Sequence, residues 1–135
     1  MNSIVIFDTS IFINYLRTGR QQQLLESVAG LIRTSSVVLS ELWRGATTLA
    51  ERGFIRALQK NHPIITPSES QWLESGQILA QIHADNGFTP TKLRDLHFDV
   101  LIALTARGVG GRLITSNRAD FEIISDYKEF RLEIW

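Results

Sequence analysis

Short apolar runs alternate with longer segments of helical spacing along this chain. The first run, Ile4–Phe7, is β-branched and aromatic without a break, which is typical of a strand buried on both faces of a parallel sheet. Asp8 and Thr9 follow it directly. Ligands bind beyond the carboxyl ends of strands in open α/β sheets, so this position is a candidate site. A simpler interpretation also fits, in which Asp8 and Thr9 only cap the next helix.

Apolar residues at helical spacing predict a series of amphipathic helices. We expect them at residues 10–16, 21–31, 37–50, 51–61, 68–84 and 95–107, with one further helical turn at 121–124. Gly53 is the expected break between the third and fourth of them. Residues 88–94 are polar and contain a proline, which indicates a mobile loop.

The remaining apolar segments predict strands that alternate with these helices. They lie at residues 31–35, 64–65, 112–116 and 130–134, and the last of them alternates apolar with charged residues, as an edge strand does. Alternation of this kind is typical of the α/β class. We therefore expect a three-layer α/β/α sandwich with a mainly parallel, roughly five-stranded sheet, built as a single domain over residues 1–135.

Composition restricts the possible partners and locations. Lys plus Arg and Asp plus Glu both number 14, so the net charge is zero and bulk charge does not hold nucleic acid here. The chain has no cysteine, so any metal ion must be held by carboxylate, amide or imidazole groups. No apolar run is long enough for a membrane span or a signal peptide, so we expect a cytoplasmic protein without a membrane partner.

Four acidic residues fall near predicted strand ends or in early helical turns: Asp8, Glu41, Asp99 and Asp120. Each of them, taken alone, is more often a cap or a surface charge. Four carboxylates that converge would repel one another, so their convergence makes sense mainly around a hard cation such as Mg²⁺ or Mn²⁺.

Four segments carry a resemblance to a known family. They are Ile-Phe-Asp-Thr-Ser at 6–10, Ser-Glu-Leu-Trp-Arg-Gly at 40–45, the helix that starts at Asp99, and Thr-Ser-Asn-Arg-Ala-Asp-Phe at 115–121. With these segments in this order, the chain resembles PIN-domain ribonucleases and, within that group, the VapC toxins of bacterial and archaeal toxin–antitoxin pairs. One position departs from the pattern, because Phe98 stands where a polar residue often precedes the third acid. Asp95, one turn earlier, is therefore a rival or an auxiliary to Asp99.

The resemblance implies a metal-dependent endoribonuclease that hydrolyses RNA phosphodiesters. It assigns Asp8, Asp99 and Asp120 to Mg²⁺, with Mn²⁺ as an alternative, and Glu41 as a further ligand or as a proton acceptor. Three polar residues, Thr9, Thr115 and Asn117, would orient the acids, although each also suits a turn or helix cap. Two cations beside acids, Arg44 and Arg118, would contact substrate phosphates, although solvated ion pairs explain them equally simply.

The resemblance also implies partners: a cognate antitoxin protein, and a second copy in a homodimer. Residues proposed for the antitoxin groove are Leu24, Leu25, Leu39, Leu42, Trp43 and Leu58. Two other functions stay open, a metal-free binding module of the same fold and a housekeeping PIN nuclease. A receiver-like domain with a phosphorylated aspartate fits less well, because it predicts a lysine at the end of a late strand, where this chain has Asn117 and Arg118.

Overall fold

A parallel sheet forms the centre of the protein in the computed structural model, which describes residues 3–135. Its strands, in spatial order, are β2 (Leu31–Ile32), β1 (Ile4–Phe7), β5 (Arg112–Thr115) and β6 (Arg131–Ile134), and every neighbouring pair is parallel. A separate parallel pair consists of β3 (Thr34–Ser35) and β4 (Ile64–Ile65). The predicted α/β fold class is confirmed. The expected single sheet of roughly five strands is instead a sheet of four strands and a separate pair.

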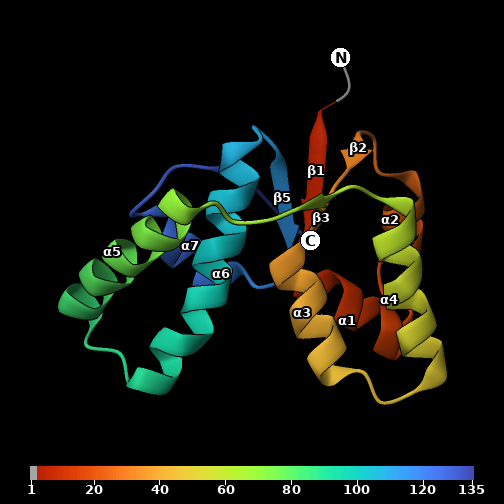
Figure 1. Ribbon diagram of the computed structural model, residues 1–135, viewed down its shortest axis with the longest axis horizontal. Coiled ribbons are helices and arrows are strands. Elements are labelled where there is room, and N and C mark those ends of the chain that lie inside the picture. Colours follow the sequence, from red (N-terminus) through yellow and green to blue (C-terminus); the bar gives the residue numbers. More distant parts are fainter. Residues whose placement is uncertain (1–2) are drawn as a thin grey trace.

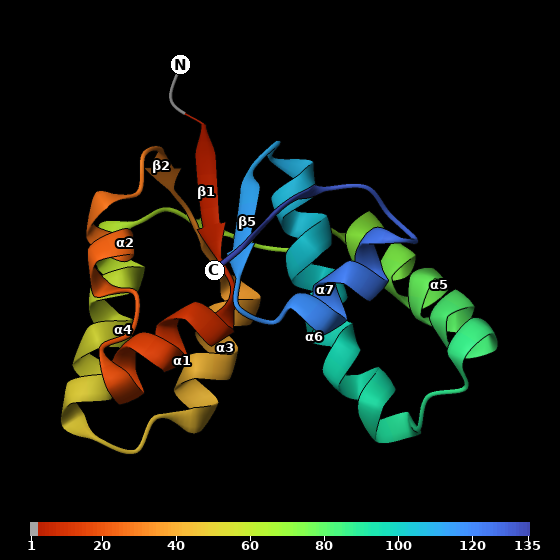
Figure 2. The ribbon, with the colours of Figure 1, turned by 180° about the vertical axis from the view of Figure 1, so that it is seen from behind.

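Two groups of helices flank the central strands (Figures 1 and 2). One group contains α1 (Thr9–Thr18), α2 (Gln22–Ser27), α3 (Ser36–Gly45) and α4 (Leu49–Asn61). The other contains α5 (Glu69–Asn86), α6 (Pro90–Gly108) and α7 (Arg118–Ser125). The segment with β4 carries the chain from one group to the other, passing across the strands (Figure 1).

The hydrophobic core lies on both faces of β1 and β5. Val5, Ile6, Leu113 and Ile114 are fully buried, as the unbroken apolar runs of these strands predict. Helix α6 contributes a continuous buried stretch at 100–106. Each fully buried aliphatic side chain stabilises the fold by about 1.5–3 kcal/mol. Within residues 3–135, no helix is both long and apolar enough to cross a bilayer.

The boundary between α3 and α4 differs from the prediction. Helix α3 ends at Gly45, five residues early, and Gly53 lies inside α4 instead of breaking it. The reason is a capping box, in which Thr48 Oγ1 accepts from the Glu51 amide at 3.1 Å while Glu51 Oε1 accepts from the Thr48 amide at 3.0 Å. These bonds satisfy the free amide groups of a new helix start, and they outweigh the apolar pattern that runs through the junction.

Helix α2 is also shorter than predicted. It stops at Ser27, and Leu31, which was assigned to it, pairs instead with Ile4 in the sheet. Gly30 makes this turn possible, since its φ of 138° favours glycine and a Cβ there would lie 2.6 Å from the Ser3 carbonyl oxygen. The close approach of two backbones therefore decides where α2 ends.

The predicted loop at 88–94 is wrong, and this difference bears on the site. Thr89 caps α6 by accepting from the Lys92 amide at 3.2 Å, and Pro90 occupies the first helical position, where its missing N–H costs nothing. Helix α6 consequently begins at Pro90 and not at Asp95. The extra turn places Lys92 on the same helix, and on the same side, as Asp95 and Asp99.

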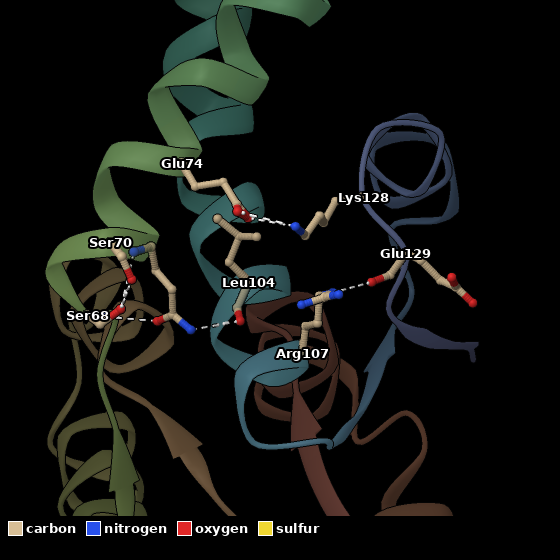
Figure 3. A network of polar contacts seen from close by, with 8 residues as sticks. Ser68, Ser70, Glu74, Leu104, Arg107, Lys128 and Glu129 are labelled. Atoms are coloured by element: carbon tan, nitrogen blue, oxygen red, sulfur yellow. Dashed lines mark hydrogen bonds and ion pairs between the residues drawn. The ribbon is translucent and has the colours of Figure 1, made fainter.

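Polar contacts join the carboxyl-terminal segment to α5 and α6 (Figure 3). Lys128, just after α7, forms a 3.0 Å ion pair with Glu74 of α5, and Arg107 of α6 donates to the Glu129 carbonyl at 2.9 Å. Gln71 of α5 donates to the carbonyl of Leu104 at 3.1 Å. These contacts fix the helical group that carries two of the four candidate acids.

Candidate active site

A cleft of about 270 Å³ opens beside the carboxyl ends of β1 and β5. All four acids that the sequence singled out line it, although they come from the residue after β1 and from α3, α6 and α7. The lining residues are Asp8, Thr9, Ser10, Ile13, Glu41, Arg44, Asp95, Phe98, Asp99, Asn117 and Asp120. The structure thus brings together residues up to 112 positions apart in the chain.

Asp8 lies at the floor of the cleft and is almost completely buried. Its Oδ2 accepts hydrogen bonds from the hydroxyls of Thr115 and Ser10, both at 2.8 Å. Burial raises the pKa of Asp8, while these hydrogen bonds oppose the rise. Asp8 also caps α1, with a long 3.4 Å contact from the Ser10 amide. Capping and a place in the cleft are therefore compatible roles for one residue.

Glu41 projects from the middle of α3 toward α1. Its Oε1 accepts a 2.7 Å hydrogen bond from the hydroxyl of Thr9, which fixes the carboxylate in place. Burial raises the pKa of Glu41, and the negative charge of Asp8 raises it further, while the Thr9 hydrogen bond and nearby Arg44 lower it. A glutamate with a raised pKa is suited to accept a proton near neutral pH.

Asp99 has a strongly raised pKa. Burial raises the pKa of Asp99 to about 9, and the charges of the other three acids add to the rise. The structure shows no hydrogen bond to its carboxyl group within residues 3–135. The positive charge of Lys92 is what opposes the rise in its pKa. An ionised Asp99 therefore needs a further cation beside it.

Asp120 lies in the first turn of α7 with both oxygens engaged. Oδ1 accepts from Lys92 Nζ at 2.6 Å in an ion pair, and Oδ2 accepts from the side-chain amide of Asn117 at 3.2 Å. Asn117 also caps α7 through a 3.4 Å contact with the Asp120 amide. Asn117 therefore orients this carboxylate, as a supporting residue does.

The two arginines proposed to bind substrate lie in different environments. Arg44 lines the cleft, and its guanidinium stands 5.7 Å from the centre of the Phe98 ring. Arg118 does not line the cleft and pairs with Glu122 at 2.8 Å on an exposed face of α7. The structure therefore supports a solvated ion pair for Arg118, and it leaves a substrate contact open for Arg44.

Two contributors were not assigned by the sequence. Ser10 accepts from the Ser116 amide at 3.0 Å while donating to Asp8, so it links the loop after β5 to the floor of the cleft. Its position two residues after Asp8 is the sequence signal that could have indicated this contact, because such residues hydrogen-bond locally in turns. Lys92 was placed in a loop, and the Thr89-Pro90 helix start is the signal that would have corrected this.

The acids are not arranged as a ready metal site. As the side chains lie, no three carboxylate or imidazole groups in residues 3–135 are grouped so that they hold one metal ion. The contacts above give the reason, because Asp8, Glu41 and Asp120 are each held by protein donors. The donor chemistry still fits a hard cation, since every acidic ligand offers oxygen, and a cation beside Asp99 would favour its ionised form.

The family follows from a comparison with known domains. The model of the PIN domain matches residues 5–126. The chain belongs to the PIN domain family. No curated protein shows a significant sequence match to it.

Solved structures share the fold of this PIN domain. A chain of DNA-bound VapBC from Salmonella typhimurium is 24% identical with a TM-score of 0.69, and the match covers 100% of this chain and 99% of that one. A chain of VapBC-1 from nontypeable Haemophilus influenzae is 21% identical with a TM-score of 0.69 and 98% coverage of both chains. A chain of VapBC2 from Rickettsia felis, bound to a promoter DNA fragment, is 20% identical with a TM-score of 0.69, and the match covers 98% of both chains.

Proposed function

We propose that this PIN domain is a Mg²⁺-dependent endoribonuclease and the toxin of a toxin–antitoxin pair. One observation carries the nuclease part: four carboxylates, from the residue after β1 and from α3, α6 and α7, line one cleft, where burial and the other three acids raise the pKa of Asp99. Acids with strongly shifted pKa values in a cleft are typical of functional sites. An oxygen-only site of this charge suits a divalent cation and, with it, a phosphodiester substrate.

Asp8, Asp99 and Asp120 would hold Mg²⁺, or Mn²⁺ in its place. When bound, such an ion polarises a phosphate oxygen and lowers the pKa of a nearby water. Asp99 must lose its proton to take part, and a bound cation would lower its raised pKa and so favour that loss. Asp8 is held in position by Thr115 and Ser10, so its carboxylate is oriented before any ligand arrives.

Glu41 would accept the proton of the attacking water. Its raised pKa suits this role, and the Thr9 hydroxyl keeps the carboxylate in one orientation. Attack in line with the leaving group would expel the 3′-oxygen and leave a 5′-phosphate. Arg44, which is exposed beside Glu41, would contact a phosphate of the RNA.

The proposed antitoxin partner is supported by the solved structures and by an apolar groove. The three solved structures compared above are VapBC structures. The groove, of about 190 Å³, lies between α1, α2 and α4, and its apolar lining consists of Phe7, Phe12, Tyr15, Leu25, Ile32, Phe54 and Leu58. An amphipathic segment of a partner fits such a surface.

The groove differs from the one predicted from the sequence. Leu25 and Leu58 do line it. Leu39 and Leu42 are buried in the core, so their assignment to the groove is wrong. They face inward because α3 packs against α1, α4 and α6, which covers its apolar side.

A homodimer stays part of the proposal. Trp72 and Leu73, at the start of α5, are exposed apolar side chains on the helical group opposite the groove. A second copy would cover such residues. Sedimentation of the purified chain, compared with Leu73→Glu, tests this: a dimer that the variant weakens supports it.

A second candidate function is a metal-free binding module of the same fold. The observation that favours it is the engagement of the acids by protein donors, which leaves no ready metal site in residues 3–135. A housekeeping nuclease differs from a toxin only in its effect on cells.

One set of experiments separates these functions. Purified protein is incubated with structured RNAs with and without Mg²⁺, beside Asp8→Asn as the matched inactive control. Cleavage only with Mg²⁺ and only by the wild type supports the nuclease. Growth arrest on expression, relieved by the small protein encoded beside it, supports the toxin. Cleavage without growth arrest indicates a housekeeping nuclease, and no cleavage indicates the binding module.

A further inference from the structure

Lys92 makes the one ion pair that any of the four candidate acids forms within residues 3–135. Its ammonium lies 2.6 Å from Asp120 Oδ1, and the two side chains are 36% and 16% exposed. The other cation at the cleft, Arg44, stands over Phe98 and pairs with none of the four acids. Lys92 is therefore distinguished by direct contact with a proposed metal ligand.

Lys92 lies in the first turn of α6. The Thr89 cap and Pro90 start the helix two residues before it, so its side chain lies on the same face as Asp95 and Asp99. Asp120 comes from α7, which packs on α6. The ion pair thus joins α6 to α7 through Asp120, which lines the cleft, and a flexible four-carbon stem carries the charge of Lys92.

Both oxygens of Asp120 are occupied, one by Lys92 and the other by the side-chain amide of Asn117. Each carboxylate oxygen has two lone pairs, so a cation could bind Asp120 beside the neutral Asn117 amide, whereas the positive charge of Lys92 opposes a cation there. Asn117 also caps α7, so its release would free a helix end. Lys92 has no such second role at its ammonium, which makes it the donor that leaves more easily.

We propose that Lys92 is an internal counter-ion that occupies Asp120 while the cleft holds no divalent cation, and that the cation displaces it. This inference rests on the proposed function, because it needs Asp120 to be a metal ligand. The ion pair stabilises the metal-free cleft by offsetting one carboxylate. It also sets the affinity for the metal, because binding must first break a charge-assisted contact.

Titration of Mn²⁺ into the full chain by calorimetry tests the competition without any RNA. Lys92→Gln removes the competing charge, and Arg44→Gln removes an equal charge from the same cleft without touching Asp120. We expect Lys92→Gln to bind Mn²⁺ roughly two- to fivefold more tightly than the wild type, the factor expected for loss of an ordinary ion pair. Arg44→Gln should gain less, because only its long-range repulsion is lost.

The outcomes separate this inference from the proposed function. Binding by the wild type with no greater gain in Lys92→Gln than in Arg44→Gln overturns the counter-ion and leaves the metal site standing. No Mn²⁺ binding by any of the three proteins overturns both. NMR of the lysine ammonium groups in the wild type adds a readout independent of the variants. The Lys92 signal should shift toward that of a solvated lysine as Mg²⁺ is added, and an unchanged signal at saturation contradicts displacement.

Discussion

The hydroxyl of Thr115 donates a 2.8 Å hydrogen bond to Asp8 Oδ2, so the end of β5 holds the acid at the end of its parallel neighbour β1. Thr115 also accepts from the Asn117 amide at 2.9 Å. One buried hydroxyl therefore organises both the floor of the cleft and the start of the last motif. The hydrogen bond is a consequence of strand register, since Phe7 pairs with Ile114 and the next residues face each other.

Thr115→Val should destabilise the protein and impair cleavage. The substitution keeps the shape but removes one of two hydroxyl donors to the buried Asp8 carboxylate and leaves the Asn117 amide without its partner, which costs about 1–3 kcal/mol. Loss of orientation at Asp8 should lower Mg²⁺-dependent cleavage by about tenfold or more. Urea denaturation and an RNA cleavage assay measure the two effects.

Thr105→Val is the matched control for that substitution. Thr105 is equally buried, but its hydroxyl donates to the Leu101 carbonyl within α6, away from the cleft. We expect near-normal cleavage from this variant. Equal losses of activity in the two variants would show that Thr115 acts only through general stability.

Asp99→Asn should abolish Mg²⁺-dependent cleavage, and Asp95→Asn should leave most of it. Both residues line the cleft, but Asp95 is exposed while Asp99 is the acid whose pKa the other three raise. Loss of a direct ligand should cost roughly a hundredfold or more. Cleavage rates under identical Mg²⁺ concentrations decide the point. If Asp95→Asn is the inactive variant, the assignment of the third acid is wrong.

The stability of the metal-free protein should fall as the pH rises. Burial and three neighbouring acids raise the pKa of Asp99 to about 9 in the fold, whereas an unfolded aspartate titrates near pH 4. Between these values the folded state binds one more proton than the unfolded state, so the free energy of unfolding decreases with pH, by up to about 1.4 kcal/mol per unit. The raised pKa values of Asp8 and Glu41 act in the same direction.

Denaturation in the presence of a chelator between about pH 6 and pH 8.5 measures this slope. Asp99→Asn should flatten it, because the amide carries no proton equilibrium. Added Mg²⁺ should reduce or reverse the slope in the wild type, since metal binding requires the ionised carboxylate. A variant slope identical to that of the wild type would refute the role given to Asp99.

Leu25→Arg should prevent co-purification with the antitoxin while preserving RNA cleavage. Leu25 lines the apolar groove, which is separate from the acidic cleft, so a charge there opposes an apolar partner without touching the acids. Leu49→Arg is the control, because Leu49 is also an exposed leucine on a helix but does not line the groove. Equal retention of the antitoxin by both variants would show that the groove is not its binding surface.

Much of the fold could be predicted because local rules decide it. The apolar runs of β1 and β5 are buried on both faces, as their composition requires. The start of α5 follows from the Ser68–Gln71 capping box, and its end follows from Gly87 in the left-handed conformation. The junction at Thr48 and the start of α6 at Pro90 carry equally local signals, which the hydrophobic pattern concealed.

The acidic site shows the boundary between the two kinds of information. The sequence alone singled out all four acids, and it placed Asp8 after β1 and Asp120 near the start of α7 correctly. Glu41 and Asp99 were expected in early helical turns, and that was wrong, because both lie in the middle of their helices. Only the tertiary structure decided what each acid contacts. The pairing of Lys92 with Asp120, of Thr9 with Glu41 and of Thr115 with Asp8 joins residues 28, 32 and 107 positions apart. Such contacts depend on the packing of helices and the register of strands, which no local pattern specifies, and they determine the charge of the cleft.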